Sequence, residues 1–274
     1  MIISVTSLKK GMGQTVSAIN LAAMISKIIE NKTLIVDINK YYHDIAYYLS
    51  NSNFTKGLDE FINLKRTDMI DEEIFLSCVK KVNKNIDIMT SNDCFEIESN
   101  DVKALKTYLK KLYPITVIDT ISSMNKITDN FLNISDVIVV IINQEKKMVK
   151  ELERSNKLEK YKDKLIFVIN RYIESIDNKM MLYKDLDIEK DIKRAGFNEN
   201  RIFKLDFDIG LMNDCNDLSL LSYILGNNDT NYLTELKGLS RYILTKYCGY
   251  HFEEEEVQRK RKIFSGGKLN FFSF

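Results

Sequence analysis

Residues 2–22 read IISVTSLKKGMGQTVSAINLA. The apolar, β-branched run at residues 2–6 predicts a strand, and from Val16 onward the apolar residues recur at helical spacing. The loop between these two elements contains Gly11 and Gly13. A glycine loop that opens a helix presents successive backbone N–H groups and the positive end of the helix dipole, so it suits a phosphate group. This stretch therefore predicts a strand, a phosphate-binding loop and a helix.

The loop departs from the ordinary phosphate-binding pattern G-x-x-x-x-G-K-[ST] at two positions. Leu8 stands where the pattern has its first glycine, and Gln14 stands where it has lysine. Gly13 and Thr15 agree with the pattern.

The same stretch resembles the deviant Walker A motif of the MinD/ParA family, K-G-G-x-G-K-[ST]-[ST] followed by A-x-N-L-A. In that comparison Lys9 is the signature lysine, and Thr15 is the hydroxyl on the magnesium side. Lys10 replaces a glycine, Gln14 replaces the second lysine, and Val16 replaces a serine or threonine. The resemblance spans roughly residues 1–245, and it implies an ATPase fold built around a bound nucleotide.

In the rest of the chain, short apolar runs alternate with segments whose apolar residues recur at helical spacing. This alternation is typical of a parallel sheet whose crossover connections are helices. We therefore expect one doubly wound, mostly parallel α/β sheet flanked by helices, as in MinD/ParA-like P-loop proteins. Further strands are expected at residues 34–37, 86–89, 115–119, 137–142, 165–169 and 202–205, and the longer helices at residues 100–112 and 232–246.

Two of these strands end in a carboxylate, at Asp37 and at Asp119. Polar residues at the carboxyl ends of parallel strands face the ligand crevice. The strand before Asp119 resembles the family's Walker B strand, which implies that Asp119 holds the hydration shell of Mg²⁺ beside Thr15. The pair Asn170-Arg171 resembles the family's N-R pair, whose asparagine amide reads the adenine edge.

The segment DINKYYHDIAYYL (residues 37–49) resembles one branch of the family, the pilus-localisation proteins called CpaE or TadZ. Asp37 and Asp44 match that branch, whereas Asn39 replaces the second aspartate of its D-x-D pattern. His43 beside Asp44 is interpreted as a surface residue, because neighbouring residues on a helix point in different directions.

The resemblance implies ATP or ADP with Mg²⁺ as the cofactor. The catalytic residues it implies are Lys9, Asp37 and Asn39, and the metal-side residues are Thr15, Asp37 and Asp119. The residues it places around the nucleotide are Lys9, Lys10, Gly11, Met12, Gly13, Gln14, Thr15, Val16, Asn170 and Arg171.

Two of these positions predict slow or absent hydrolysis. Phosphoryl transfer needs positive charge where negative charge develops, and Gln14 donates a hydrogen bond but carries no charge. Asn39 orients water and magnesium less well than a carboxylate. Lys10 is close enough in sequence to supply the missing charge, so the sequence leaves hydrolysis open.

Composition describes an ordinary globular chain of 274 residues, with 45% hydrophobic residues and a net charge of +1. Such a charge gives no global case for nucleic-acid binding. The four cysteines form no C-x-x-C pair, and no signal peptide is recognised at the N-terminus. We expect a cytoplasmic protein, and leave open whether it gathers at the inner face of the membrane or at a cell pole. In this family the signature lysine reaches the partner's nucleotide, so Lys9 also implies a homodimer.

The composition changes after Gly249. We expect a domain at residues 1–249 and a tail at residues 250–274, in which an acidic run precedes a basic cluster and several phenylalanines. The tail has three interpretations: contact with an anionic membrane surface, a docking peptide for a protein partner, or a disordered end.

Three functions remain open from the sequence. The first is a dimeric localisation or assembly factor for a pilus or secretion system. The second is an active ParA- or MinD-type ATPase switch in DNA partitioning or cell-division positioning. The third is a redox protein of the nitrogenase-iron-protein type, which would need paired cysteines at the dimer seam, where only Cys94 stands in a suitable kind of loop.

Overall fold

The computed structural model describes residues 1–39, 44–49, 56–91, 96–123, 125–154, 156–174, 183–226 and 229–252. The strands are β1 (Ile2–Ser7), β2 (Thr33–Asp37), β3 (Lys80–Lys81), β4 (Ile86–Met89), β5 (Ile115–Asp119), β6 (Val137–Ile142), β7 (Leu165–Tyr172) and β8 (Ile202–Asp206). The helices are α1 (Gln14–Ile29), α2 (Asp44–Leu49), α3 (Leu58–Arg66), α4 (Glu72–Ser77), α5 (Ser99–Leu112), α6 (Lys126–Ile134), α7 (Lys146–Arg154), α8 (Asp185–Arg194), α9 (Ile209–Asn216), α10 (Leu220–Leu225) and α11 (Asn231–Cys248).

The described strands form one sheet in the order β3-β4-β2-β5-β1-β6-β7-β8. Neighbouring strands run parallel except β3, which pairs antiparallel with β4 at one edge. β1 lies between β5 and β6, so the chain winds first to one side of β1 and later to the other. The predicted doubly wound, mostly parallel sheet is confirmed.

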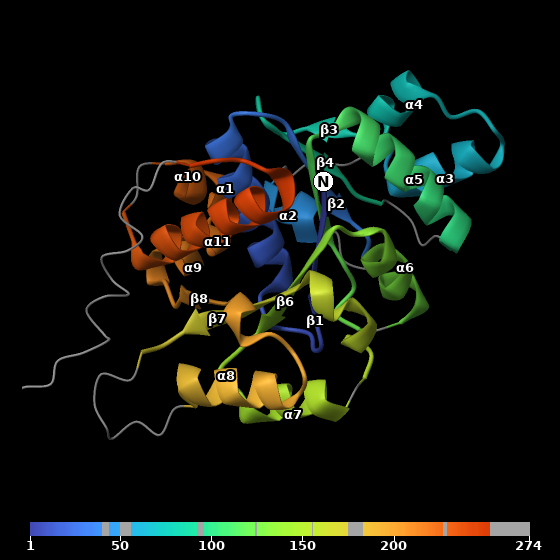
Figure 1. Ribbon diagram of the computed structural model, residues 1–274. Helices are drawn as coiled ribbons and strands as arrows, with labels where there is room; N and C mark the ends of the chain where they lie inside the picture. The colour runs from blue at the N-terminus through green and yellow to red at the C-terminus, as the bar shows by residue number, and fades with distance from the viewer. Residues whose placement is uncertain are drawn as a thin grey trace, which may run out of the picture.

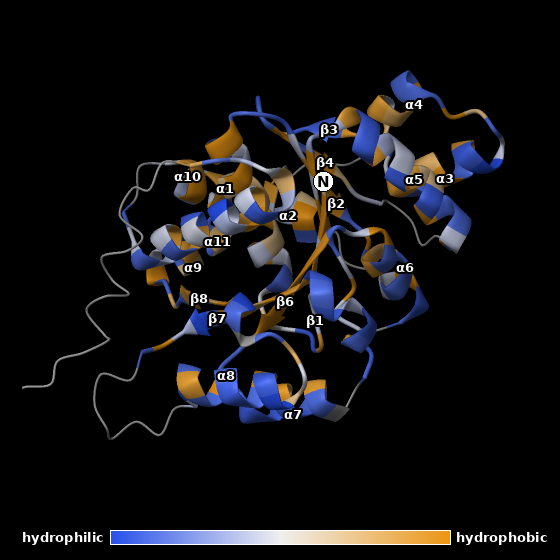
Figure 2. Cartoon of the chain, viewed as in Figure 1, coloured by the Kyte–Doolittle hydropathy of each residue, from blue (hydrophilic) through white to orange (hydrophobic). Residues whose placement is uncertain are grey.

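Helices cover both faces of this sheet (Figure 1). α1, α10 and α11 pack together on one face, while α5 with α6, and α7 with α8, lie on the other. The inner strands are buried on both sides, which explains why they are almost uninterrupted apolar runs rather than alternating ones. In Figure 2 the central strands are mostly orange, whereas the outer helices α7 and α8 show much blue.

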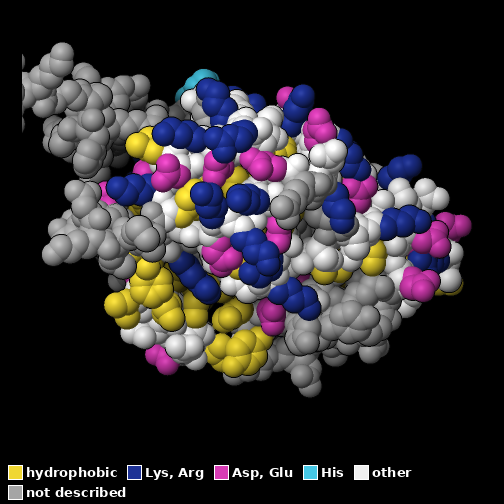
Figure 3. Space-filling view, turned by 90° about the horizontal axis from the view of Figure 1, so that it is seen from below, with side chains coloured by type: hydrophobic (Ala, Val, Ile, Leu, Met, Phe, Trp, Pro, Cys, Tyr) yellow, Lys and Arg dark blue, Asp and Glu magenta, His cyan; other side chains and the backbone are white. Residues whose placement is uncertain are grey.

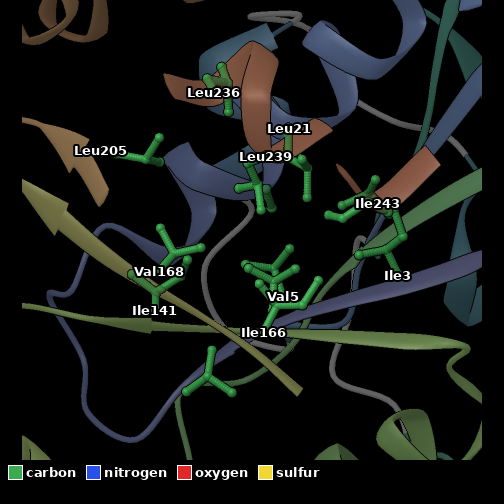
Figure 4. Close-up of a cluster of buried hydrophobic side chains, with 14 of the residues drawn as sticks. Ile3, Val5, Leu21, Ile141, Ile166, Val168, Leu205, Leu236, Leu239 and Ile243 are labelled. Atoms are coloured by element: carbon green, nitrogen blue, oxygen red, sulfur yellow. The ribbon is translucent and has the colours of Figure 1, made fainter. Parts of the chain in front are cut away.

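The main hydrophobic core lies between the sheet and the pair α1 and α11. Figure 4 shows Leu236 and Leu239 of α11 and Leu21 of α1 on one side of this core, with Val5 and Ile166 of the strands on the other. All five are at most 2% exposed. A polar contact also joins the two helices, because the amide Nδ2 of Asn20 donates a hydrogen bond to the Tyr232 hydroxyl at 2.6 Å.

The predicted strands are all present, with differences at their ends. β7 continues to Tyr172, beyond the expected end at residue 169, through an irregular pairing with β8. The two-residue strand β3 was not expected, because a pair of lysines carries no strand signal. Residues 40–43 of the branch segment with His43, Cys94, and residues 253–274 of the tail lie outside the described residues. None of the described helices is long and apolar enough to span a membrane.

Candidate nucleotide site

The candidate site lies at the carboxyl ends of the central strands. β1 ends at Ser7, and the loop of residues 8–13 leads into α1. Because β5 and β6 flank β1 on opposite sides, this loop lies where the strand order reverses. In open α/β sheets ligands bind at that position. The fold therefore places the glycine loop where a ligand is expected.

Two glycines give the loop its shape. Gly11 has φ +82° and Gly13 has φ +81°, in the left-handed region that side chains disfavour. Around Gly11 an added Cβ would meet nothing within 4 Å, whereas at Gly13 it would lie 2.4 Å from Nδ2 of Asn170. Gly11 is therefore required for its backbone angles alone, and Gly13 also for the close approach of Asn170.

Gly13 is the N-cap residue of α1 and makes no side-chain capping hydrogen bond. The first backbone N–H groups of a helix have no partner within the helix, and here no side chain at the cap position satisfies them. The N-terminal end of α1 can therefore donate backbone hydrogen bonds to a phosphate group.

Gln14, the first residue of α1, points into the protein and is 5% exposed. Its Nε2 donates hydrogen bonds to Oδ1 of Asp119, at 2.7 Å, and to the carbonyl of Thr120. Its Oε1 accepts from the hydroxyls of Ser7, at 2.8 Å, and Ser122, at 3.1 Å. The Gln14 carboxamide therefore makes its hydrogen bonds within the protein, at the position where the ordinary pattern has a phosphate-binding lysine.

Thr15 and Asp119 lie together, as the resemblance implies. The Thr15 hydroxyl donates to Oδ2 of Asp119 at 2.7 Å. Burial raises the pKa of Asp119 to about 7, although the hydrogen bonds from Thr15 and Gln14 act in the opposite direction. Asp119 is 3% exposed, so a cation beside it would relieve the energetic penalty of burying its charge.

Asp37 ends β2 and lies directly beside Asp119 in the sheet. Its Oδ1 accepts a hydrogen bond from the backbone N–H of Asn39 at 2.8 Å. Within the described part of the chain its Oδ2 is buried without a hydrogen-bond partner. Burial, together with the charge of Asp119, raises the pKa of Asp37 well above its ordinary value.

This arrangement fits a divalent cation. Two carboxylates and the Thr15 hydroxyl are oxygen donors of the kind that Mg²⁺ prefers, and Oδ2 of Asp37 is buried with no hydrogen-bond partner among the described residues. Asn39 is only partly buried, and it approaches Asp37 through its backbone.

Asn170 and Arg171 approach the loop from the end of β7. Nδ2 of Asn170 donates to the backbone carbonyl of Met12 at 2.8 Å. Arg171 has φ +53°, unusual for a residue with a side chain. One guanidinium nitrogen of Arg171 lies 3.8 Å from the place of a Cβ on Gly13. The Asn170 amide therefore faces the phosphate loop in this structure, and an adenine-reading role remains a prediction.

The lysines of the loop differ from Gln14 in pointing outward. Lys9 forms an ion pair with Glu145 at 3.5 Å, and both side chains are about half exposed, at 49% and 44%. Lys10 is also exposed. By contrast, the side chains of Met12 and Val16 pack against the core, so only their backbone can face a nucleotide.

The structure therefore gathers most of the predicted site residues at one edge of the sheet. Sequence reasoning missed Ser7, Thr120, Ser122 and Glu145. The hydroxyls of Ser7 and Ser122 lie at or just beyond strand ends, which is the one signal that points to them. Glu145 carries no signal, because an acidic residue after a strand is usually a solvated loop residue.

Comparison with known proteins agrees with this geometry. A profile of the AAA domain family AAA_31 matches residues 1–174. The structure is similar to a ParA family ATPase of Chlorobium tepidum, with 19% identity, a TM-score of 0.71, and coverage of 88% of this chain and 97% of that one. No curated protein sequence matches the chain.

Two further structures share the fold. A plasmid partition protein of Borrelia burgdorferi bound to AMPPNP has 23% identity and a TM-score of 0.66, covering 89% of this chain and 98% of that one. The MinC:MinD cell division complex of Aquifex aeolicus has 14% identity and a TM-score of 0.72, covering 93% and 98%. The sheet order, the glycine loop and the profile match over residues 1–174 together show that the chain belongs to the AAA domain family AAA_31 and has the fold of ParA and MinD ATPases.

Proposed function

We propose that the protein binds ATP or ADP with Mg²⁺ at the loop of residues 8–13 and hydrolyses ATP slowly or not at all. The observation that carries this proposal is Gln14, whose buried carboxamide replaces a phosphate-binding lysine. The binding side is supported by the uncapped N-terminus of α1 and by the Thr15–Asp119 contact. The Borrelia burgdorferi protein bound to AMPPNP supports a nucleotide as the ligand.

The slow hydrolysis follows from charge. Removing one electrostatic donor from a transition state lowers the rate by about 10²–10³-fold. Asn39 removes a second charge beside Asp37, since an amide does not act as a base. The residues assigned to chemistry are thus Lys9, Asp37 and Asn39, and those assigned to the metal are Thr15, Asp37 and Asp119.

The protein is further proposed to act as a dimer, with Lys9 reaching the nucleotide of the partner copy. Lys9 is suited to this because its side chain is exposed, and among the described residues its ammonium pairs with Glu145, which is exposed as well. Surface ion pairs contribute about 0–1 kcal/mol, so Lys9 is easily released to a phosphate.

As the biological role we propose localisation or assembly of a pilus or secretion system. The support is the resemblance of the segment at residues 37–49 to the CpaE/TadZ branch. The domain of residues 1–249 would carry the nucleotide, and the tail of residues 250–274 would contact a protein partner or the inner face of the membrane.

The surface supports a protein partner better than a nucleic acid. On the face shown in Figure 3, lysine and arginine side chains are interspersed with acidic ones, and hydrophobic side chains gather at one edge. Large exposed hydrophobic residues follow the neighbouring strands β7 and β8, at Ile173 and Phe207, and continue into α9 at Ile209 and Met212. Clustered exposed apolar residues mark interaction sites.

The second candidate is an active ATPase switch of the ParA or MinD type, which the similarity of fold to both kinds of structure, over 88% and 93% of this chain, supports equally well. Steady-state turnover separates the two candidates. We expect calorimetry to show binding of ATP with Mg²⁺ while phosphate release stays at background. Magnesium-dependent hydrolysis that Lys9→Ala abolishes would establish the switch instead.

A cellular test addresses the role. An affinity-tagged wild-type chain should capture pilus or secretion-assembly proteins from its native cells, and the Lys9→Ala variant should capture fewer because it fails to dimerise. Capture of DNA-partitioning proteins alone would favour the second candidate.

A further inference from the structure

The carboxamide of Gln14 makes hydrogen bonds to four groups at the ends of β1 and β5. On one side are the two acceptors Asp119 and the carbonyl of Thr120, and on the other are the two hydroxyls of Ser7 and Ser122. Because Gln14 opens α1, these contacts fasten the start of that helix, and with it the glycine loop, to two strands of the sheet.

This environment is matched to an amide. The Thr120 carbonyl only accepts, so the NH₂ end of Gln14 faces Thr120 and Asp119, and its oxygen faces the two hydroxyls. The Ser7 proton is shared with a second acceptor, the carbonyl of Lys9, at 2.9 Å. Lysine has three donors and no acceptor, so it would satisfy Asp119 but could not accept the proton of either hydroxyl.

A phosphate group could engage Gln14 only if the side chain left these partners. The buried oxygens of Asp119 and Thr120 would then lose a donor, which is unfavourable in a site with little water. Gln14 is therefore more than a lysine position that has lost its charge.

We propose that Gln14 is a positioning residue that fixes the glycine loop to the end of β5 and leaves the site unable to distinguish a nucleoside triphosphate from a nucleoside diphosphate. The first half stands on the hydrogen bonds alone. The second half rests on the nucleotide binding proposed above.

The loss of discrimination follows from charge. A third phosphate adds negative charge, which a buried lysine at this position would neutralise. Here residue 14 is neutral, and the neighbouring strand ends carry the buried carboxyls of Asp37 and Asp119. Lys9, Lys10 and Arg171 are all exposed, so solvent screens their attraction for the extra charge.

Urea unfolding tests the first half. Gln14→Met keeps the length of the side chain and removes every hydrogen bond, whereas Gln14→Glu keeps the shape and sets a negative oxygen against Asp119. We expect both variants to unfold at lower urea than the wild type, with Gln14→Glu the lower. Gln144→Met, at a partly exposed glutamine beyond β6, is the matched control and should lower the midpoint less.

If Gln14→Glu does not fold, a less disruptive substitution, Ser122→Ala, can be compared in two backgrounds. Ser122→Ala should lower the urea midpoint in the wild-type background and leave it unchanged in the Gln14→Met background, because its hydroxyl acts through Gln14. Equal effects of Ser122→Ala in both backgrounds, or a Gln14→Met variant as stable as the wild type, would overturn the positioning role.

Calorimetric titration of the full chain with ATP and with ADP, each with Mg²⁺, tests the second half. Both titrations use the wild-type chain, and Lys9→Ala is titrated in parallel to measure what contacts across a dimer contribute. We expect the two dissociation constants to agree within about threefold, and Gln14→Lys to make ATP at least about tenfold tighter than ADP, the size of one charge-assisted contact.

The outcomes are separable. ATP binding more than about tenfold tighter than ADP with Gln14 in place would overturn the loss of discrimination while leaving nucleotide binding intact. Binding of neither nucleotide would instead overturn the proposed function, and the unfolding experiments would still decide the role of Gln14.

Discussion

The glycine loop offers a sharp test of the structure, because its two glycines have nearly the same φ but different surroundings. Gly11 and Gly13 differ by one degree in φ. An added methyl group at Gly11 meets nothing within 4 Å, and at Gly13 it lies 2.4 Å from Nδ2 of Asn170. Substituting alanine at each position therefore separates the backbone contribution from the contact.

The expected magnitudes follow from these two effects. A side chain in the left-handed region costs about 1–2 kcal/mol, and this is the whole loss expected for Gly11→Ala. Gly13→Ala also displaces Asn170 and breaks its hydrogen bond to the Met12 carbonyl. An unsatisfied buried polar group costs about 1–3 kcal/mol, so the total expected for Gly13→Ala is about 2–5 kcal/mol.

The assay is urea unfolding followed by circular dichroism, with the free energy of unfolding extrapolated to water. The control is the Asn170→Ala background, in which Gly13→Ala should cost no more than Gly11→Ala does in the wild type. Equal losses for the two glycine variants in the wild-type background would refute the close approach of Asn170 to the loop. The close approach would also be refuted if Gly13→Ala lowered the free energy of unfolding by the same amount in the Asn170→Ala background as in the wild type.

Three further results are expected. Burial raises the pKa of Asp119 from 3.8 to about 7, so the folded state holds this proton more tightly than the unfolded chain does. Its stabilisation is complete below about pH 4 and is lost as the pH rises through about 7. Relative to Asp119→Asn, the wild-type free energy of unfolding should therefore fall between about pH 4 and pH 7 and level off above that. Lys9→Ala removes an exposed ion pair with Glu145 and should change the free energy of unfolding by less than about 1 kcal/mol by the same urea assay, so a loss of dimerisation cannot be ascribed to unfolding. Tyr232→Phe leaves the buried Asn20 amide without its acceptor and should lower the thermal midpoint, with a loss of about 1–3 kcal/mol.

The fold could be predicted because its signals are local. Each inner strand is a short apolar run, and the parallel arrangement follows from the helices between them. The edge strand β3 has no such signal, since Lys80 and Lys81 pair with β4 only because the chain turns back there. The extension of β7 through Arg171 was missed for a related reason, because a positive φ at an arginine is set by its neighbours in space.

The sequence predicts which strand ends form the candidate site, but it does not predict the hydrogen bonds within the site. Strand ends place Asp37 and Asp119 side by side, and the sequence contains that information. By contrast, three of the four partners of Gln14 lie more than a hundred positions away in the sequence, and which oxygen faces which nitrogen depends on packing. The sequence shows that Gln14 replaces a lysine, and the structure shows which groups Gln14 binds.

The proposed nucleotide site holds ATP without converting it rapidly to ADP. The most direct measurement mixes excess purified protein with radiolabelled ATP and Mg²⁺, collects the protein with its bound nucleotide on a filter at successive times, and separates the retained nucleotide by chromatography. We expect label to be retained and to remain ATP over many minutes. Absence of retained label, or retained nucleotide that is already ADP at the first time point, would contradict the claim.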